Sequence, residues 1–375
     1  MSAVTPTTRI PFLNLPEQHQ ALRQEIQDAI HPLLDGARFV GGETVTTFEQ
    51  KFGAAHDCDH TVGLKSGTAA LFLAMQALDI GPGDEVIVPA FTFIATAAPV
   101  MLLGATPIFV DVDPVFACID PNAVEDAITE KTKLIVAVHL YGHPAAIDEL
   151  VSLGNRHNLP VLEDCAQSHL STWNGKKTGS FGVAGTFSFY PSKNLGAAGD
   201  AGAMTCSDEA FAQKVRQLSN HGRTGRYDHA FVGWNERLDA LQAAVLTVKL
   251  GHLEAWTEER RTAAERYNRL LSNVTPFGSS LVLPTEHPDA RHVYHLYVIR
   301  HPERERLHTA LADAGIDTGT HYPTTLPAQS AFAEVPKRHS LPQAEAWAQE
   351  CLALPLFPGI TEEQQTYVAK VLGEL

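Results

Sequence analysis

Glu163-Asp-Cys-Ala-Gln167 and Ser188-Phe-Tyr-Pro-Ser-Lys193-Asn-Leu-Gly196 are the two stretches that decide the fold of this chain. Asp164 ends a β-rich run, and Lys193 lies in a turn after the strand expected at Gly182–Phe189. Ligands of open α/β sheets bind at the carboxyl ends of parallel strands. Taken singly, such an Asp is often a helix cap and such a Lys is usually solvated. Together they predict a ligand site.

The sequence around these stretches alternates between β-rich and helical segments. Strands are expected at His60–Lys65, Glu85–Pro89, Thr106–Asp111, Lys133–Leu140, Leu159–Glu163, Gly182–Phe189 and Ala201–Cys206. Helices are expected at Thr68–Leu78, Thr96–Leu103, after the capping pair Asp120-Pro121, and at Ala145–His157. This order predicts an α/β fold, with a mainly parallel sheet flanked by helices.

The C-terminal part of the chain has a different pattern. A long helix is expected from about Glu236 to Leu271, with an apolar stripe that includes Leu238 and Val245. Beyond it we expect one strand and three helices, at His292–Arg300, Pro302–Ala314, Leu341–Leu352 and Thr361–Leu375. The sequence therefore predicts a large domain over residues 1–250 and a smaller α+β domain over residues 251–375.

The bulk composition excludes several kinds of protein. With 28 Lys and Arg against 43 Asp and Glu, the net charge is −15, which argues against a nucleic-acid or anionic-membrane surface.

The five cysteines are widely spaced, so neither disulfides nor a zinc ribbon are expected. His56-Asp-Cys-Asp-His60 resembles a metal cluster, but alternate side chains of an extended segment diverge, so no metal is predicted. The N-terminus lacks a signal-peptide pattern, which predicts a cytoplasmic protein.

Asp164 and Lys193 fit the chemistry of pyridoxal phosphate (PLP). A carboxylate beside the pyridine nitrogen raises the pKa of its protonated form by roughly 1–3 units. The protonated ring is the electron sink of this cofactor. A lysine would supply the imine nitrogen and, once displaced, its free amine can move a proton.

A candidate phosphate cradle lies further upstream. Ser66-Gly67-Thr68 stands between an expected strand and the helix that begins near Thr68. Gly67 allows close backbone approach, and the helix N-terminus offers free N–H groups beside two hydroxyls. An ordinary strand–helix turn capped by Ser or Thr explains the same three residues equally well.

These residues belong to a longer series of blocks, and the chain resembles the DegT/DnrJ/EryC/StrS family of PLP-dependent sugar aminotransferases. Six blocks precede the two stretches quoted above: Pro11-Phe-Leu, Gly41-Gly-Glu-Thr-Val, Ser66-Gly-Thr-Ala-Ala-Leu, Gly81-Pro-Gly-Asp-Glu-Val, Thr92-Phe-Ile-Ala-Thr and Val138-His-Leu-Tyr-Gly. Two more follow those stretches: Asn235-Glu-Arg-Leu-Asp-Ala-Leu-Gln-Ala-Ala and His321-Tyr-Pro. The resemblance implies a type I, aspartate-aminotransferase-like PLP fold.

The resemblance also implies residue roles. Lys193 would be the Schiff-base lysine and Asp164 the partner of the pyridine nitrogen. The other cofactor contacts implied are Gln167 near the ring hydroxyl, Phe93 on the ring face, and Ser66, Gly67, Thr68 and Ser188 at the phosphate. Asn235 would reach the phosphate of a neighbouring subunit in a homodimer with shared active sites, although alone it reads as the N-cap of the long helix. His321 and Tyr322 would line the sugar site.

The expected reaction moves an amino group from an amino acid, by resemblance L-glutamate, through pyridoxamine phosphate to a nucleotide-linked keto sugar. Lys193 favours transamination over the dehydration performed by relatives with histidine there. The run Lys193–Ala203 resembles members that act on 3-keto nucleotide sugars, and a 3-keto-6-deoxyhexose is the expected acceptor. A 4-keto sugar, an aminocyclitol ketone and a non-catalytic PLP-binding regulator remain open. Leu170 stands where the family usually has Gly, and we expect it to narrow the site.

Overall fold

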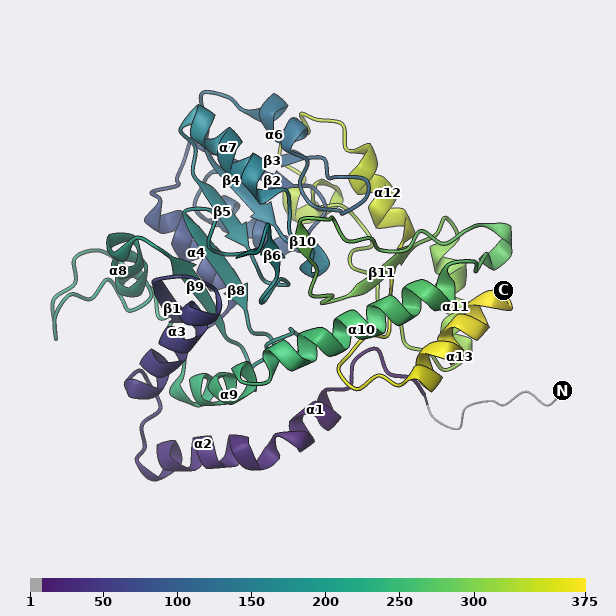
Figure 1. Ribbon diagram of the computed structural model, residues 1–375. Helices are drawn as coiled ribbons and strands as arrows, with labels where there is room; N and C mark the ends of the chain where they lie inside the picture. The colour runs from purple at the N-terminus through teal and green to yellow at the C-terminus, as the bar shows by residue number, and fades with distance from the viewer. Residues whose placement is uncertain (1–8) are drawn as a thin grey trace.

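The central element of the fold is a seven-stranded sheet. The computed structural model describes residues 9–375, and its sheet has the strand order β1-β9-β8-β5-β4-β2-β3 (Figure 1). The bounds are β1 His60–Leu64, β2 Glu85–Pro89, β3 Thr106–Val110, β4 Thr132–Val138, β5 Val161–Asp164, β8 Ala184–Ser188 and β9 Gly202–Cys206. All neighbouring pairs are parallel except those of β9, which is antiparallel to β1 and β8. The mainly parallel α/β sheet predicted from the sequence is confirmed.

Helices cover this sheet, as Figure 1 shows. Their bounds are α3 Glu43–Ala55, α4 Gly67–Ala77, α5 Ala98–Leu102, α6 Pro121–Ala127, α7 Ile147–His157 and α8 Glu209–Leu218, with short 3-10 turns at Ile94–Thr96 and Leu140–Gly142. Helix α4 packs beside α5 and α8, and α6 packs beside α7. As predicted, Asp120 caps α6, since its carboxylate accepts a hydrogen bond from the N–H of Asn122.

The expected long helix and the helix expected over Thr96–Leu103 differ from the structure in their bounds. The long helix begins at Ala240 rather than near Glu236, and it is divided into α9, Ala240–Leu250, and α10, Leu253–Leu271. The residue before α9 is Asp239, so the interpretation of Asn235 as a helix cap is also wrong. The helix expected over Thr96–Leu103 shortens to α5, and its Leu102 is 72% exposed.

The C-terminal part contains a strand that the sequence did not predict. Cys351–Leu354 forms β12, which pairs antiparallel with β11, Tyr297–Arg300. The expected helix over Leu341–Leu352 therefore ends early, as α12, Pro342–Glu350. The remaining helices are α11, Arg304–Asp313, and α13, Glu362–Gly373, with short 3-10 turns at Pro276–Gly278, Leu326–Ala328 and Ser330–Phe332. A small three-stranded sheet, β10-β6-β7, joins Ala290–Arg291, Thr172–Trp173 and Lys176–Lys177.

The two ends of the chain meet in a separate apolar core. Residues of α10, α11, α13 and the β11–β12 pair gather there, together with Ile10, whose N–H donates to Gly315. The N-terminal helices α1, Leu15–Ala21, and α2, Arg23–Asp35, lead from this core to α9. The domain boundary near residue 250 stays a prediction. Within residues 9–375, the helices are all too short or too polar to cross a bilayer.

Candidate active site

A cavity of about 340 Å³ opens at the carboxyl ends of the central strands. Its lining includes every predicted site residue except Asn235: Ser66, Gly67, Thr68, Phe93, Asp164, Gln167, Ser188, Lys193, His321 and Tyr322. These residues come from β5, from the ends of β2 and β8, from the start of α4, and from the segment that follows α11. The fold therefore brings segments far apart in sequence into one site.

Asp164 is the buried acidic residue of this cavity. It ends β5, is buried, and pairs with Thr186 of β8. Its Oδ1 accepts a hydrogen bond of 3.1 Å from the N–H of Ala166, and its Oδ2 accepts one of 2.9 Å from the Thr96 hydroxyl. Burial raises the pKa of the Asp164 carboxyl, against the opposing effect of these donors and of Lys193. A cationic ring placed against this carboxylate would relieve that cost.

Lys193 is the basic residue of the same cavity. Its backbone N–H donates to the carbonyl of Tyr190 over 2.8 Å, which closes the turn after β8. Burial lowers the pKa of the Lys193 amine to about 8, although the charge of Asp164 acts in the other direction. An appreciable fraction of the amine is therefore neutral near physiological pH, as a nucleophile requires.

The predicted phosphate cradle is a helix N-terminus pressed against a strand end. Ser66 caps α4, and its Oγ accepts a hydrogen bond from the N–H of Ala69 over 3.0 Å. A Cβ on Gly67 would lie 2.7 Å from Cβ of Ser188, so only glycine permits this approach. The exposed Thr68 lines the cavity at the first turn, where helical N–H groups have no intrahelical acceptor. This arrangement suits an anion.

The cavity offers a flat group an aromatic surface. Phe93 is 53% exposed although it lines the cavity, and its ring centre lies 5.8 Å from that of Tyr322.

Gln167 is held at both ends of its amide. Its Oε1 accepts from the N–H of Tyr141 over 2.6 Å, and its Nε2 donates to the Tyr322 hydroxyl over 3.4 Å.

His321 and Tyr322 form the wall contributed by the C-terminal part. The His321 ring stacks on Phe12 at 5.8 Å between ring centres and 15° between planes. The Tyr141 hydroxyl donates to the His321 carbonyl. Burial, with a smaller effect of Lys193, lowers the pKa of the His321 imidazole. The imidazole is therefore neutral at pH 7, and it can donate or accept a hydrogen bond.

Asn235 and Leu170 lie outside the cavity lining. Asn235 is exposed, and its Oδ1 accepts from Arg237 over 2.7 Å, so it serves no role in the cavity of its own chain. Leu170 is buried in the core with a φ of +65°, which explains why glycine suits this position. The expectation that Leu170 narrows the site is wrong, because its side chain packs into the core beneath.

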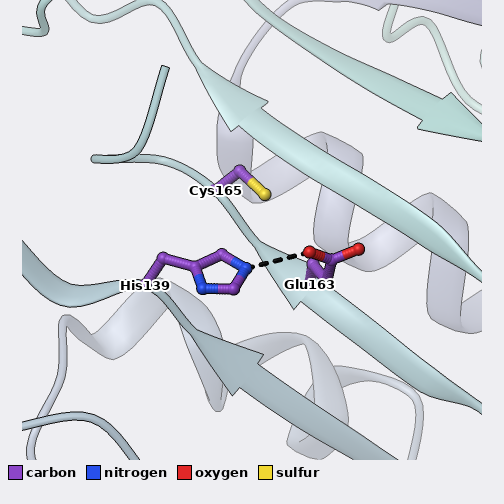
Figure 2. Close-up of side chains that lie close together, drawn as sticks. All are labelled: His139, Glu163 and Cys165. Carbon is purple, nitrogen blue, oxygen red and sulfur yellow. Dashed lines mark hydrogen bonds and ion pairs between the residues drawn. The ribbon is translucent and has the colours of Figure 1, made fainter. Parts of the chain in front are cut away.

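One cluster has the composition of a metal site. In the part of the chain that the structure describes, only His139, Glu163 and Cys165 bring three ligand atoms within 4.8 Å of one another (Figure 2). Nδ1 of His139 accepts from the N–H of Ala145 over 3.0 Å, so Nε2 carries the proton and donates to Glu163 over 3.0 Å. Burial raises the pKa of the Cys165 thiol well above its usual value. The ring nitrogens of His139 and the carboxylate of Glu163 are therefore engaged in hydrogen bonds within the protein.

The sequence motif His56–His60 is explained in a similar way. Nδ1 of His56 donates to the carbonyl of Phe52 over 3.0 Å, and its Nε2 accepts from the N–H of Leu170 over 3.3 Å. The Cys58 thiol donates to backbone carbonyls. The motif therefore ties backbone segments together, including the left-handed turn at Leu170.

Several residues near the cavity were not predicted from the sequence. The structure adds Thr92, Tyr190 and His295 to the lining, and Thr96 behind Asp164. Nδ1 of His295 lies 3.1 Å from Oδ1 of Asn194, whose amide donates to Val293. The only signal for Thr92 and Thr96 is the block Thr92-Phe-Ile-Ala-Thr96, which carries no spacing that links it to Asp164.

Comparison with known proteins gives a consistent picture. The DegT/DnrJ/EryC1/StrS aminotransferase family matches residues 20–373. The chain is 44% identical over 366 residues to a pleiotropic regulatory protein of Geobacillus stearothermophilus, covering 97% of this chain and 98% of the relative. It is 42% identical over 375 residues to a dTDP-3-amino-3,4,6-trideoxy-alpha-D-glucose transaminase of Streptomyces venezuelae, covering 100% and 98%.

A third relative and a solved structure complete the comparison. The chain is 43% identical over 369 residues to a UDP-N-acetyl-3-dehydro-alpha-D-glucosamine 3-aminotransferase of Acidithiobacillus ferrooxidans, covering 98% of each. The crystal structure of S. venezuelae DesV in complex with a ketimine intermediate superimposes with a TM-score of 0.94 at 42% identity, covering 98% of each chain. The likeness extends over both the central sheet and the C-terminal part.

Proposed function

The chain belongs to the DegT/DnrJ/EryC1/StrS aminotransferase family, and we propose that it transfers an amino group from L-glutamate to a nucleotide-linked keto sugar. Aminotransferases of this family depend on PLP, and PLP and pyridoxamine phosphate are the cofactor forms. The observation that carries the proposal is one buried cavity that holds a lysine, a carboxylate and a helix N-terminus. Each matches one part of the cofactor.

The cavity residues fit a planar, phosphorylated ring. We assign covalent attachment to Lys193, the ring nitrogen to Asp164, and the ring face to the open side of Phe93. We assign binding of the phosphate to Ser66, Gly67, Thr68 and Ser188, and a contact with the ring hydroxyl to Gln167. When bound, PLP supplies the electron sink that makes the α-proton of an amino acid removable.

The chain's own residues supply the remaining steps. Asp164 holds a proton on the ring nitrogen because its buried carboxylate is stabilised by a cation. Lys193, once released, has a pKa lowered to about 8, so an appreciable fraction of it is a neutral amine that can accept and return the migrating proton. His321 and Tyr322 orient the sugar, and their wall limits the access of water to the reacting carbon.

The acceptor class follows from the relatives that are named as enzymes. Two of them are named for amino groups at C3 of a nucleotide-linked sugar. The run Lys193–Ala203 points the same way, so we assign a 3-keto sugar, with a 3-keto-6-deoxyhexose as the first candidate. A 4-keto sugar or an aminocyclitol ketone would use the same residues.

The same proposal includes a homodimer with shared active sites. Asn235 is exposed and lies outside its own cavity, which supports a role at the phosphate of the neighbouring subunit. Asn235→Ala should lower the affinity for PLP while leaving the protein folded. A monomer with full activity would contradict this part of the proposal. The cytoplasmic location expected from the sequence stays a prediction.

Spectroscopy of the purified protein tests the reaction directly. With PLP bound, we expect a yellow protein whose visible absorbance disappears on adding L-glutamate and returns on adding a 3-keto nucleotide sugar. Lys193→Ala should abolish turnover, while Lys133→Ala, an exposed lysine of β4, should retain it. Full turnover by Lys193→Ala would rule out the mechanism.

A regulatory role is the second candidate, because one relative is named a pleiotropic regulatory protein. A PLP-binding regulator would keep its absorbance unchanged when L-glutamate is added. A panel of 3-keto and 4-keto nucleotide sugars, with products identified by mass and NMR, then separates the possible acceptors.

A further inference from the structure

The carboxylate of Asp164 is held by two donors of different origin. The N–H of Ala166 is a local contact, only two residues away in the chain. The Thr96 hydroxyl comes from the 3-10 turn Ile94–Thr96, 68 residues earlier in sequence, and its Oγ1 lies 2.9 Å from Oδ2. Both Thr96 and Asp164 are buried, with exposed fractions of 1% and 5%. Thr96 therefore fixes the carboxylate from another part of the fold.

A second threonine extends this contact into a chain of hydrogen bonds. Oγ1 of Thr92 lies 3.1 Å from Oγ1 of Thr96, and Thr92 is also buried. A hydroxyl has one proton to donate, and an ionised carboxylate only accepts. Because Thr96 gives its proton to Asp164, it accepts from Thr92. The order of donation is thus Thr92 to Thr96 to Asp164.

The same turn also carries the aromatic wall of the cavity. Phe93 stands between the two threonines in sequence and is 53% exposed in the cavity lining, while Thr92 and Thr96 are both buried. A buried threonine in a helical turn usually donates to a nearby backbone carbonyl. Here the hydroxyl instead reaches a carboxylate that lines the cavity. One short turn therefore determines the positions of the ring-facing Phe93 and of Asp164 together.

We propose that Thr96 is a positioning residue for the cofactor: its hydroxyl, oriented by Thr92, keeps Asp164 ionised and leaves a carboxylate lone pair for the pyridine nitrogen. This rests on the proposed pairing of Asp164 with the ring. A hydrogen bond to a charged group of this kind corresponds to roughly 1–2 pKa units of the carboxyl. Lys193 and His139 also favour the ionised form of Asp164.

Thr96→Val tests the proposal, because valine keeps the shape of threonine and removes the donor. In the cofactor-free protein, the pKa of the Asp164 carboxyl, followed by isotope-edited infrared titration with Asp164→Asn as the reference, should rise by roughly 1–2 units. PLP affinity should fall about tenfold or more, since one pKa unit corresponds to a tenfold change. Thr96→Ser restores the donor and should recover most of the affinity.

The control is Thr257→Val, at a buried threonine of α10 whose hydroxyl donates only to the Leu253 carbonyl. It removes a buried hydroxyl but should move neither the Asp164 pKa nor the PLP affinity. If Thr96→Val does not fold, Thr92→Val is tested instead, and we expect it to raise the pKa of the Asp164 carboxyl by a smaller amount.

The outcomes separate this inference from the proposed function. The positioning role is overturned if Thr96→Val leaves both the Asp164 pKa and the PLP affinity unchanged. The same holds for Thr92→Val if Thr96→Val does not fold and Thr92→Val is used in its place. If the unmodified protein forms no visible complex with PLP, the proposed function fails as well. If Asp164→Asn weakens PLP binding while Thr96→Val does not, only the positioning role is wrong.

Discussion

Glu163 and Asp164 are adjacent buried carboxylates on β5, yet their side chains have different surroundings. Glu163 accepts four hydrogen bonds, from His139 and from the N–H groups of Gly179, Phe181 and Gly182, all between 2.8 and 3.0 Å. Asp164 accepts two and lines the cavity. The first carboxylate has its acceptor capacity filled by the protein, while the second has lone pairs left for a ligand.

The difference follows from strand geometry. Successive side chains of a strand point to opposite faces, so the carboxylates of Glu163 and Asp164 lie in different surroundings although they are adjacent in sequence. Glu163 joins the end of β5 to the loop that leads into β8. Figure 2 shows its contact with His139. The contacts of Glu163 are structural, while Asp164 lines the cavity and has the role that we propose for it at the ring nitrogen.

The largest expected effect comes from exchanging the charge of Asp164. Asp164→Asn should slow transamination by roughly 10- to 1000-fold, because the carboxylate shifts the ring pKa by roughly 1–3 units. The free energy of unfolding should not fall, since a buried charge is removed. Steady-state rates with L-glutamate, together with thermal unfolding, measure both quantities. If Asp164→Asn unfolds the protein and leaves the rate per folded molecule intact, the distinction between the two carboxylates is wrong.

The opposite result is expected for Glu163. Glu163→Gln places an amide N–H₂ against N–H donors, and it should lower the free energy of unfolding by about 3 kcal/mol. The rate per folded molecule should stay within a few-fold of the original. Urea unfolding measures the loss, and Glu149→Gln, at an exposed position of α7, is the matched control. Equal stabilities of the two variants would contradict the structural role of Glu163.

The sequence predicted the residues that line the cavity better than the residues that hold Glu163. Asp164 and Lys193 follow strands that can be recognised from the neighbouring residues alone. The candidate phosphate cradle at Ser66–Thr68 is likewise indicated by local strand, turn and glycine signals. The partners of Glu163 depend on the path of the loop before β8, which no local pattern encodes. Thr96 was missed for the same reason, because its contact with Asp164 spans 68 residues of sequence.

The errors in the C-terminal part have the same origin. Cys351–Leu354 continues an apolar pattern that suits a helix, and it becomes β12 only because β11 lies beside it. The division of the predicted long helix at Gly251–His252 follows a glycine with low helix propensity. Helix and strand periods cannot be distinguished over so short an apolar run.

The pH dependence of cofactor loading sharpens the functional side of the comparison. Burial lowers the pKa of Lys193 to about 8, so the neutral amine decreases tenfold for each pH unit below that value. The rate of covalent PLP attachment to the cofactor-free protein should therefore rise with pH and level off above pH 8. Stopped-flow absorbance measures the rate. Binding of pyridoxamine phosphate, which needs no lysine amine, should not show this dependence on Lys193.

Asp164 and Glu163 should also differ in this experiment. The charge of Asp164 raises the pKa of Lys193, so Asp164→Asn should shift the plateau to lower pH. Glu163→Gln should leave the plateau in place. A shift of equal size in both variants would mean that Lys193 responds to either charge, which would break the comparison.

The smallest effects are expected at Leu170, which belongs with the structural residues. Its φ of +65° costs a side chain roughly 1–2 kcal/mol relative to glycine. Leu170→Ala and Leu170→Gly both lose buried apolar contacts, but the glycine variant should be more stable than the alanine variant by about 1 kcal/mol. In an ordinary helix or strand the order is reversed. Urea unfolding of the two variants compares them directly.

Activity provides the second measurement on the Leu170 variants. Because the Leu170 side chain packs among core residues and lies outside the cavity lining, the KM for the keto sugar should change by less than about twofold in either variant, within the effect of a typical remote substitution. Leu170 would then resemble Glu163, whose removal changes stability rather than chemistry. A large fall in KM for bulky sugars in Leu170→Gly would show instead that this side chain shapes the acceptor site from behind the cavity wall.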